Sequence, residues 1–218
     1  MNQNNYFTEQ EAFWAGEFGD DYIGRNKGEN QVASNIMFFS KILLRIGSIE
    51  SAIEFGANIG LNLLAMKQLL PSAKFAAIEI NDKAARELKH IQGVDVYQDS
   101  ILNFTPAKKY ELVLAKGVLI HIAPDRLIDV YERLYQASSK FILLAEYYII
   151  QRLLKFRIVV IKRSFSNVTL RGKCWIGFLN FDYWTMVLSI IEILSLKTIL
   201  PGFSWKNNTY INEHCHSC

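Results

Sequence analysis

The sequence predicts an α/β fold in which a mostly parallel sheet is covered by helices on both faces. Short apolar runs of strand length occur at 51–56, 75–80, 94–97, 110–115 and 140–146. Helical patterns separate them at 59–70, 82–91 and 124–137. Because strands alternate with helices of this length, we expect βαβ units and a doubly wound sheet.

Start signals support these helices and predict two more near the N-terminus. Asp82 and Pro124 are suitable first residues for the helices that they precede. A short helix is expected at 9–15, and Asn30 or Ser34 can cap a longer one that runs to about Arg45. We therefore expect a helical cap or lid over residues 1–46 and a sheet core over residues 47–148.

The turn after the first apolar run, in SAIEFGANIG at 51–60, is the most informative segment. Gly56 stands where the chain leaves a strand, where a Cβ would collide with the turn or with a ligand, and Gly60 lets the next helix pack closely. The pattern E-x-G-x-x-x-G has Asn58 where a dinucleotide-binding loop has its middle glycine. Glu79 closes the second run, at the spacing of a ribose-binding acid. This combination favours S-adenosylmethionine, which carries an amino acid and an adenosine.

The chain also resembles a known enzyme family over about residues 9–148. The matching segments are QEAFWAGEFGDDYIGRN at 10–26, EFGANIGLNL at 54–63, AIEIN at 77–81, DSILNF at 99–104, KGVLIHIAPDRL at 116–127 and EYY at 146–148. As an ordered set they resemble the class I S-adenosylmethionine-dependent methyltransferases, and within them the pseudaminic acid biosynthesis-associated methylase family. The resemblance implies a Rossmann-like fold.

The resemblance also implies which residues bind the cofactor at the carboxyl ends of the strands. Residues 54–60 would hold the methionine part, Glu79 the ribose hydroxyls, and residues 99–101 the adenine. The expected cofactor-binding residues are Glu54, Gly56, Ala57, Asn58, Gly60, Glu79, Ile80, Asp99, Ser100, Ile101, Lys116 and Gly117. For Asp99 and Lys116, an ordinary turn and a solvated lysine remain open.

Acceptor residues are expected on the N-terminal segment and after the fourth and fifth strands. His121 is a candidate general base, although a histidine between apolar neighbours is more often structural. The N-terminal aromatic residues favour a lid over the transferable methyl group, and covering the edge of the sheet is the alternative. The remaining expected acceptor-binding residues are Trp14, Tyr22, Arg25, Glu146, Tyr147 and Tyr148.

The predicted function is therefore methyl transfer from S-adenosylmethionine to a small-molecule or sugar-related acceptor, linked by resemblance to pseudaminic acid biosynthesis. Such transfer mainly needs alignment and exclusion of water, so no metal is expected. No basic stripe precedes residue 149, and the N-terminus is polar, so we expect a cytoplasmic protein without nucleic acid or membrane partners. An NAD(P)-dependent oxidoreductase and a non-catalytic remnant that at most binds the cofactor are the alternatives, and the oligomeric state stays open.

Residues 149–218 differ in character from the preceding part. Residues 1–148 hold 18 of the 21 acidic and 15 of the 24 basic residues, so the remainder is strongly basic. Residues 174–200 are apolar and long enough for a membrane span, but Asp182 and Glu192 would lie inside it.

A shifted reading frame explains this segment better than a membrane span. Because tryptophan has one codon, the codons around Trp175, Trp184 and Trp205, read one base earlier, force residues that agree with the C-terminal part of the same family. We hypothesise that residues after Tyr148 are out of frame, through sequencing error or real slippage. The sheet would then lack the last two strands that are usual in this fold.

Overall fold

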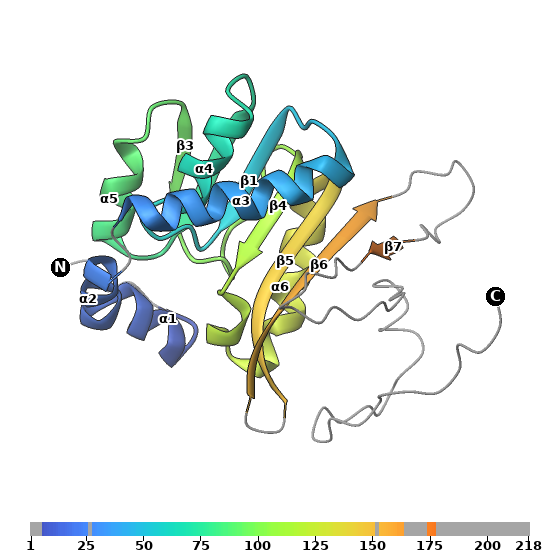
Figure 1. Cartoon of the computed structure of the whole chain (residues 1–218). Helices are drawn as coiled ribbons and strands as arrows, with labels where there is room; N and C mark the ends of the chain where they lie inside the picture. The colour runs from blue at the N-terminus through green and yellow to red at the C-terminus, as the bar shows by residue number, and fades with distance from the viewer. Residues whose placement is uncertain (1–5, 26–27, 151–152, 164–173, 178–218) are drawn as a thin grey trace, which may run out of the picture.

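One seven-stranded sheet forms the centre of the molecule. The computed structural model describes residues 6–25, 28–150, 153–163 and 174–177. The strands are β1 (Ser51–Phe55), β2 (Lys74–Glu79), β3 (Val94–Gln98), β4 (Tyr110–Lys116), β5 (Ser138–Ile150), β6 (Leu153–Arg163) and β7 (Cys174–Gly177). Their order in the sheet is β3-β2-β1-β4-β5-β6-β7, and β1 to β5 are parallel (Figure 1). The strand order reverses between β1 and β4, where ligands bind in such sheets.

Helices lie on both faces of the sheet, as the sequence predicts (Figure 1). They are α1 (Glu9–Ala15), α2 (Glu17–Arg25), α3 (Glu29–Ile46), α4 (Leu61–Leu69), α5 (Asp82–Lys89) and α6 (Leu127–Ala137), with 3-10 turns η1 (Leu119–His121) and η2 (Pro124–Arg126). One apolar core contains Phe39 of α3 and Leu63 of α4, and a second contains Val130 and Leu134 of α6. The expected α/β fold is confirmed.

Most predicted elements start and end within two residues of the observed ones. The helix at 9–15 begins with a capping box in which the Thr8 side chain and Glu11 pair reciprocally. Helix α2 was not expected. Asn30 and Ser34 do not cap α3, because the helix already begins at Glu29, after Gly28 with a φ of 148°.

The expectation that the sheet stops after the fifth strand is wrong. β6 pairs antiparallel with β5 over Phe141 to Ile150, and β7 pairs antiparallel with β6. The edge of β5 would otherwise leave backbone groups unpaired, and Ile158 to Ile161 are four consecutive β-branched residues with high strand propensity.

Much of the C-terminal segment lies outside the described residues, including most of 174–200. The shifted frame after Tyr148 therefore stays a hypothesis, as do the domain boundaries. Within the part of the chain that the structure describes, no helix combines the length and apolar character of a membrane span.

Candidate functional site

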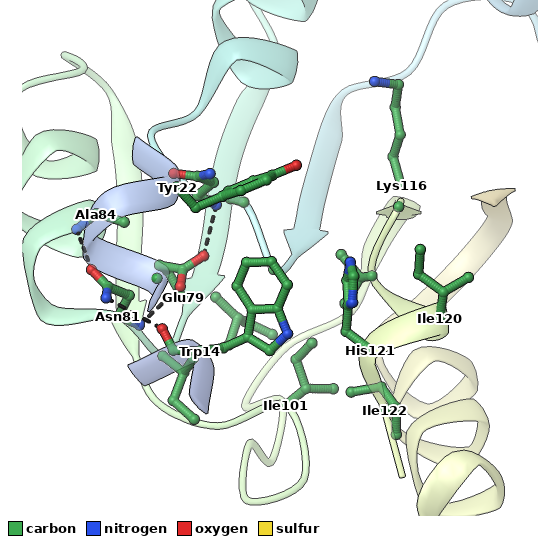
Figure 2. A pocket seen from close by; sticks show the side chains of 18 of the residues that line it. Trp14, Tyr22, Glu79, Asn81, Ala84, Ile101, Lys116, Ile120, His121 and Ile122 are labelled. Atoms are coloured by element: carbon green, nitrogen blue, oxygen red, sulfur yellow. Dashed lines mark hydrogen bonds between the residues drawn. The ribbon is translucent and has the colours of Figure 1, made fainter. Parts of the chain in front are cut away.

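A cavity of about 500 Å³ opens at the carboxyl ends of β1, β2 and β4. This volume is within the range of small-molecule sites. Residues of α1, α2 and α3 line it together with the strand ends and η1. In Figure 2, Trp14 of α1 lies between Glu79, at the end of β2, and His121 of η1. The N-terminal helices and the sheet therefore contribute to one site.

The turn after β1 has a backbone conformation that few residues tolerate. The φ angles of Gly56, Asn58 and Gly60 are 72°, 49° and 81°. A Cβ on Gly56 would lie 2.8 Å from a methyl carbon of Val118, so the packing of the loop after β4 excludes a larger residue there. A Cβ on Gly60 would lie 2.5 Å from Ile91 Cδ1, just after α5, so Gly60 allows close packing against this region instead of against the next helix, α4.

Glu79 lines the cavity and orders the turn beside it. Its side chain is 8% exposed; Oε2 accepts a hydrogen bond from the Asn58 N–H at 2.7 Å, and Oε1 one from the Asn81 N–H at 2.8 Å (Figure 2). Burial raises the pKa of Glu79, and these backbone donors lower it in part. A carboxylate has about four acceptor positions, so Glu79 keeps capacity for ligand hydroxyls.

Glu54 lies behind the cavity wall and does not line it. Its Oε1 accepts a hydrogen bond from Asn62 Nδ2 at 2.6 Å, and its Oε2 has no partner among the described residues. Burial raises the pKa of Glu54 to about 8, while the Asn62 bond and the charge of Lys116 lower it. Asn62 does line the cavity and was missed. Glu54 therefore acts on the cavity through Asn62.

The loop after β3 contributes two of its three predicted residues. Ser100 and Ile101 line the cavity. Asp99 is exposed and does not line the cavity, and its Oδ1 accepts a hydrogen bond from the Ser100 N–H at 2.7 Å. The Ser100 hydroxyl donates to Glu11, a buried residue of α1. Glu11 was missed, although the spacing Thr8-x-x-Glu11 is a capping-box signal.

Asn81 joins the N-terminal helix pair, α1 and α2, to the sheet core. Its Nδ2 donates to the Trp14 carbonyl at 3.3 Å and to Asp20 Oδ1 at 2.9 Å, while its Oδ1 caps α5. Lys83 forms an ion pair with Asp20 at 2.6 Å, and these two partners lower the pKa of Asp20. Asn81 lines the cavity but was not predicted as a site residue.

Aromatic rings form the wall of the cavity near η1. The Trp14 ring lies 4.4 Å from the His121 ring and 5.1 Å from the Tyr22 ring, centroid to centroid. All three residues line the cavity. Burial lowers the pKa of His121, so its imidazole is neutral at pH 7 and able to accept a proton.

The other four expected acceptor residues are Arg25, Glu146, Tyr147 and Tyr148, and the first two do not line the cavity. Arg25 does not line the cavity, and its guanidinium lies 5.6 Å from the Phe18 ring centroid. Glu146 supports η1 instead, because its Oε1 accepts hydrogen bonds from the N–H groups of Val118 and Leu119 at 2.9 and 3.0 Å. Tyr147 and Tyr148 belong to β5, and their side chains lie outside the described part of the chain.

Of the remaining predicted cofactor-binding residues, all but Gly60 line the cavity. Lining residues are Gly56, Ala57, Asn58, Ile80, Lys116 and Gly117, whereas Gly60 lies behind the turn. Gln31, Ser34 and Asn35 of α3 also line the cavity and were missed. No group of three or more potential metal ligands occurs among the residues that the structure describes.

Comparison with known proteins identifies the fold. No family model and no curated protein matches the chain. The plantazolicin methyltransferase BpumL with SAH has a similar structure at 19% identity and a TM-score of 0.52, over 63% of this chain and 56% of that one. Magnesium protoporphyrin IX methyltransferase from Synechocystis PCC 6803 with SAM matches at 12% identity and a TM-score of 0.55, over 74% and 100%.

The mitomycin 7-O-methyltransferase MmcR is a third similar structure, at 14% identity and a TM-score of 0.53, over 66% of this chain and 44% of that one. The chain thus spans about half the length of two of these enzymes. At such identities the likeness is one of fold. The chain has the Rossmann-like α/β fold of class I S-adenosylmethionine-dependent methyltransferases.

Proposed function

We propose that this protein is a methyltransferase that uses S-adenosylmethionine and acts on a small-molecule acceptor. The single observation that carries the proposal is the position of Glu79. This buried carboxylate faces the cavity at the end of β2, and it holds the left-handed turn at Asn58 with one of its oxygens. A nucleoside with two neighbouring hydroxyls suits such an acid beside a backbone turn.

The surrounding residues fit the rest of that cofactor. Ser100 and Ile101 would contact the base, and Gly56 to Asn58 would contact the amino acid part. The turn lacks the glycine pattern of a diphosphate-binding loop, which disfavours NAD(P). The similar solved structures include methyltransferases crystallised with SAM or SAH, which supports the same choice.

When bound, S-adenosylmethionine supplies an activated methyl group, so the protein's task is mainly placement. Trp14 and Tyr22 would exclude water from the reacting atoms, since both line the cavity beside His121. Neutral His121 would accept the proton of an acceptor hydroxyl or amine at its free ring nitrogen. Glu146 would hold η1, and so His121, in place through its two backbone hydrogen bonds.

For the acceptor, we propose a sugar-related molecule connected with pseudaminic acid biosynthesis, and a cytoplasmic site of action. The support is the sequence resemblance over residues 9–148. The methyltransferases of similar structure act on plantazolicin, a magnesium porphyrin and mitomycin, so they differ too widely to select an acceptor.

Calorimetric titration of the full chain with SAM, SAH, NAD⁺ and NADH tests the cofactor. We expect binding of SAM and SAH and none of the nicotinamide cofactors. Methyl transfer is then measured by mass spectrometry on a panel of sugars and other hydroxylated small molecules. Binding of NADH without binding of SAH would replace the proposal by the oxidoreductase alternative. Failure to bind any of the four would favour the non-catalytic remnant.

A further inference from the structure

Asn81 is in contact with both the sheet side and the helix side of the cavity. Its N–H donates to Glu79 Oε1 at 2.8 Å. Its side chain donates in the other direction, to the Trp14 carbonyl at 3.3 Å and to Asp20 Oδ1 at 2.9 Å. In Figure 2, Asn81 lies beside Glu79 and the backbone of Trp14. One residue thus joins the expected ribose-binding acid to the helix pair that carries the aromatic wall.

The position of Asn81 is fixed from several sides. The residue is 3% exposed. Its Oδ1 accepts a hydrogen bond from the Ala84 N–H at 2.9 Å, and its carbonyl accepts one from the Ala85 N–H at 2.9 Å. A Cβ on Gly19 would lie 2.8 Å from Asn81 Nδ2, so α2 packs directly on the amide. A buried amide in such a network cannot move without leaving a polar group unpaired, which is costly.

Two other contacts bind the helix pair to the core, but they do not involve Glu79. The Ser100 hydroxyl donates to Glu11 from the loop after β3. Lys83 pairs with Asp20 at 2.6 Å, and the lysine side chain is 59% exposed. An ion pair in that position contributes little to stability. Asn81 is therefore the contact through which Glu79 can act on the helix pair.

We propose that Asn81 is a positioning residue that couples ribose binding at Glu79 to the docking of α1 and α2. The inference rests on the proposed methyltransferase function and adds an order of binding to it. Ribose hydroxyls that donate to Glu79 stabilise its ionised form, which is the stronger acceptor for the Asn81 N–H. The Asn81 side chain is then held where it binds the helix pair. Because coupling between sites is reciprocal, docking also raises the affinity for the cofactor.

The coupling has a consequence for the acceptor. Trp14 and Tyr22 line the cavity from the helix pair, so the wall that they form is complete only when the pair is docked. The cofactor therefore binds first and completes the wall that the acceptor meets.

Hydrogen exchange of the backbone amides of residues 8–25, followed by mass spectrometry on the full chain, measures the docking. The unmodified protein is saturated with SAH or with its 2′,3′-dideoxy analogue, which keeps the base, the thioether and the amino acid but lacks both hydroxyls. We expect SAH to slow the exchange about 10-fold and the analogue to slow it by about twofold or less. Equal protection by the two ligands would overturn the proposal, because direct contact with the ligand would then suffice.

Asn81→Asp tests the link itself. The variant keeps the shape of the side chain, the oxygen that caps α5 and the N–H that binds Glu79, but it lacks the two side-chain donors. At saturation, SAH should slow exchange in this variant by about twofold or less. Adding Asp20→Asn supplies an amide donor opposite the new carboxylate and should restore part of the protection. Lys83→Met removes the exposed ion pair of the same helix and should keep the full effect.

Full protection of residues 8–25 by SAH in folded Asn81→Asp would overturn the proposal and leave the cofactor assignment intact. Circular dichroism and thermal melting show whether each variant is folded, and the comparison of the two ligands needs no variant. If SAH does not bind to the unmodified chain, the proposed function fails instead.

The link is then tested without a ligand. Glu79→Gln should speed exchange in residues 8–25 of the otherwise unmodified protein and cause no further change when combined with Asn81→Asp. Additive effects of the two substitutions would show that Glu79 does not act through Asn81.

Discussion

The turn after β1 and the N-terminal helix pair line the same cavity, but different contacts hold them. The turn is shaped by its own backbone, because Gly56, Asn58 and Gly60 all have positive φ angles. A Glu79 oxygen lies 2.7 Å from the Asn58 nitrogen and holds the turn. The helix pair is held by side chains such as Asn81, Ser100 and Lys83, which bind it from the sheet core. We therefore expect that single substitutions loosen the helix pair more readily than they change the turn.

The largest effect is expected at Glu79, on the turn side. In Glu79→Ala, the N–H groups of Asn58 and Asn81 lose their acceptor, and the ligand hydroxyls lose theirs. Two hydrogen bonds to a charged group correspond to about 3 kcal/mol or more, so SAH affinity should fall about 100-fold or more. Calorimetry measures this, with Glu79→Gln as a milder control. Affinity within a few-fold of the unmodified protein would contradict the assigned role.

Gly19→Ala should separate the helix pair from the core. A Cβ at Gly19 would overlap the Trp14 carbonyl oxygen, a backbone atom that cannot move without changing the crossing of α1 and α2. The expected cost is about 1–3 kcal/mol, the range for overpacking, and it should appear as weaker SAH binding and a red shift of the tryptophan fluorescence. Gly24→Ala is the matched control in the same helix, since a Cβ there meets no atom within 4 Å. If Gly19→Ala and Gly24→Ala have the same SAH affinity and the same fluorescence, the close contact of α1 and α2 at Gly19 does not hold the helix pair in place.

The pH dependence of stability should report the buried acid behind the turn. The pKa of Glu54 is raised from 4.5 to about 8 in the folded state. Below about pH 4.5 the carboxyl group is protonated in the folded and in the unfolded chain, and its burial then costs the fold least. Stability should fall as the pH rises from about 4.5 to about 8, because the unfolded chain releases the proton first. Urea unfolding of the unmodified protein and of Glu54→Gln at several pH values measures the difference. If the free energy of unfolding depends on pH in the same way in both proteins, Glu54 is not the group that causes the dependence.

The smallest effect is expected at the contact between the helix pair and η1. Trp14→Ala uncovers His121, so less burial acts on the imidazole and its lowered pKa should rise towards its ordinary value. Trp14→Phe, which keeps a ring, should change the pKa less. NMR titration of the His121 ring protons compares the three proteins. An unchanged pKa in Trp14→Ala would mean that other residues desolvate His121.

The sequence locates those features whose signal is a short pattern along the chain. Gly56, Asn58 and Glu79 belong to a turn and a strand end whose spacing along the chain is characteristic, and the structure brings them together at one cavity. The five parallel strands were predictable for the same reason, because each is a short apolar run between helices.

The sequence does not locate contacts whose partners are distant along the chain. Asn81 binds Trp14 and Asp20 across 67 and 61 residues, and Ser100 binds Glu11 across 89, so no local pattern reveals these pairs. Arg25 is a residue that the sequence overrated. Its charge suggested that it binds the acceptor, but its guanidinium lies over the Phe18 ring. Helix α2 was missed since its two glycines weaken helix propensity, which tertiary packing overcomes.

The cavity has a further property with consequences for engineering. Every lining residue that the structure describes precedes residue 124, and Glu146 of β5 supports η1. Among the described residues none beyond β5 lines the cavity, so a chimaera that exchanges this segment, for example for the frame-restored sequence, keeps every described lining residue. Such chimaeras would report the contribution of the sheet edge to folding separately from ligand recognition.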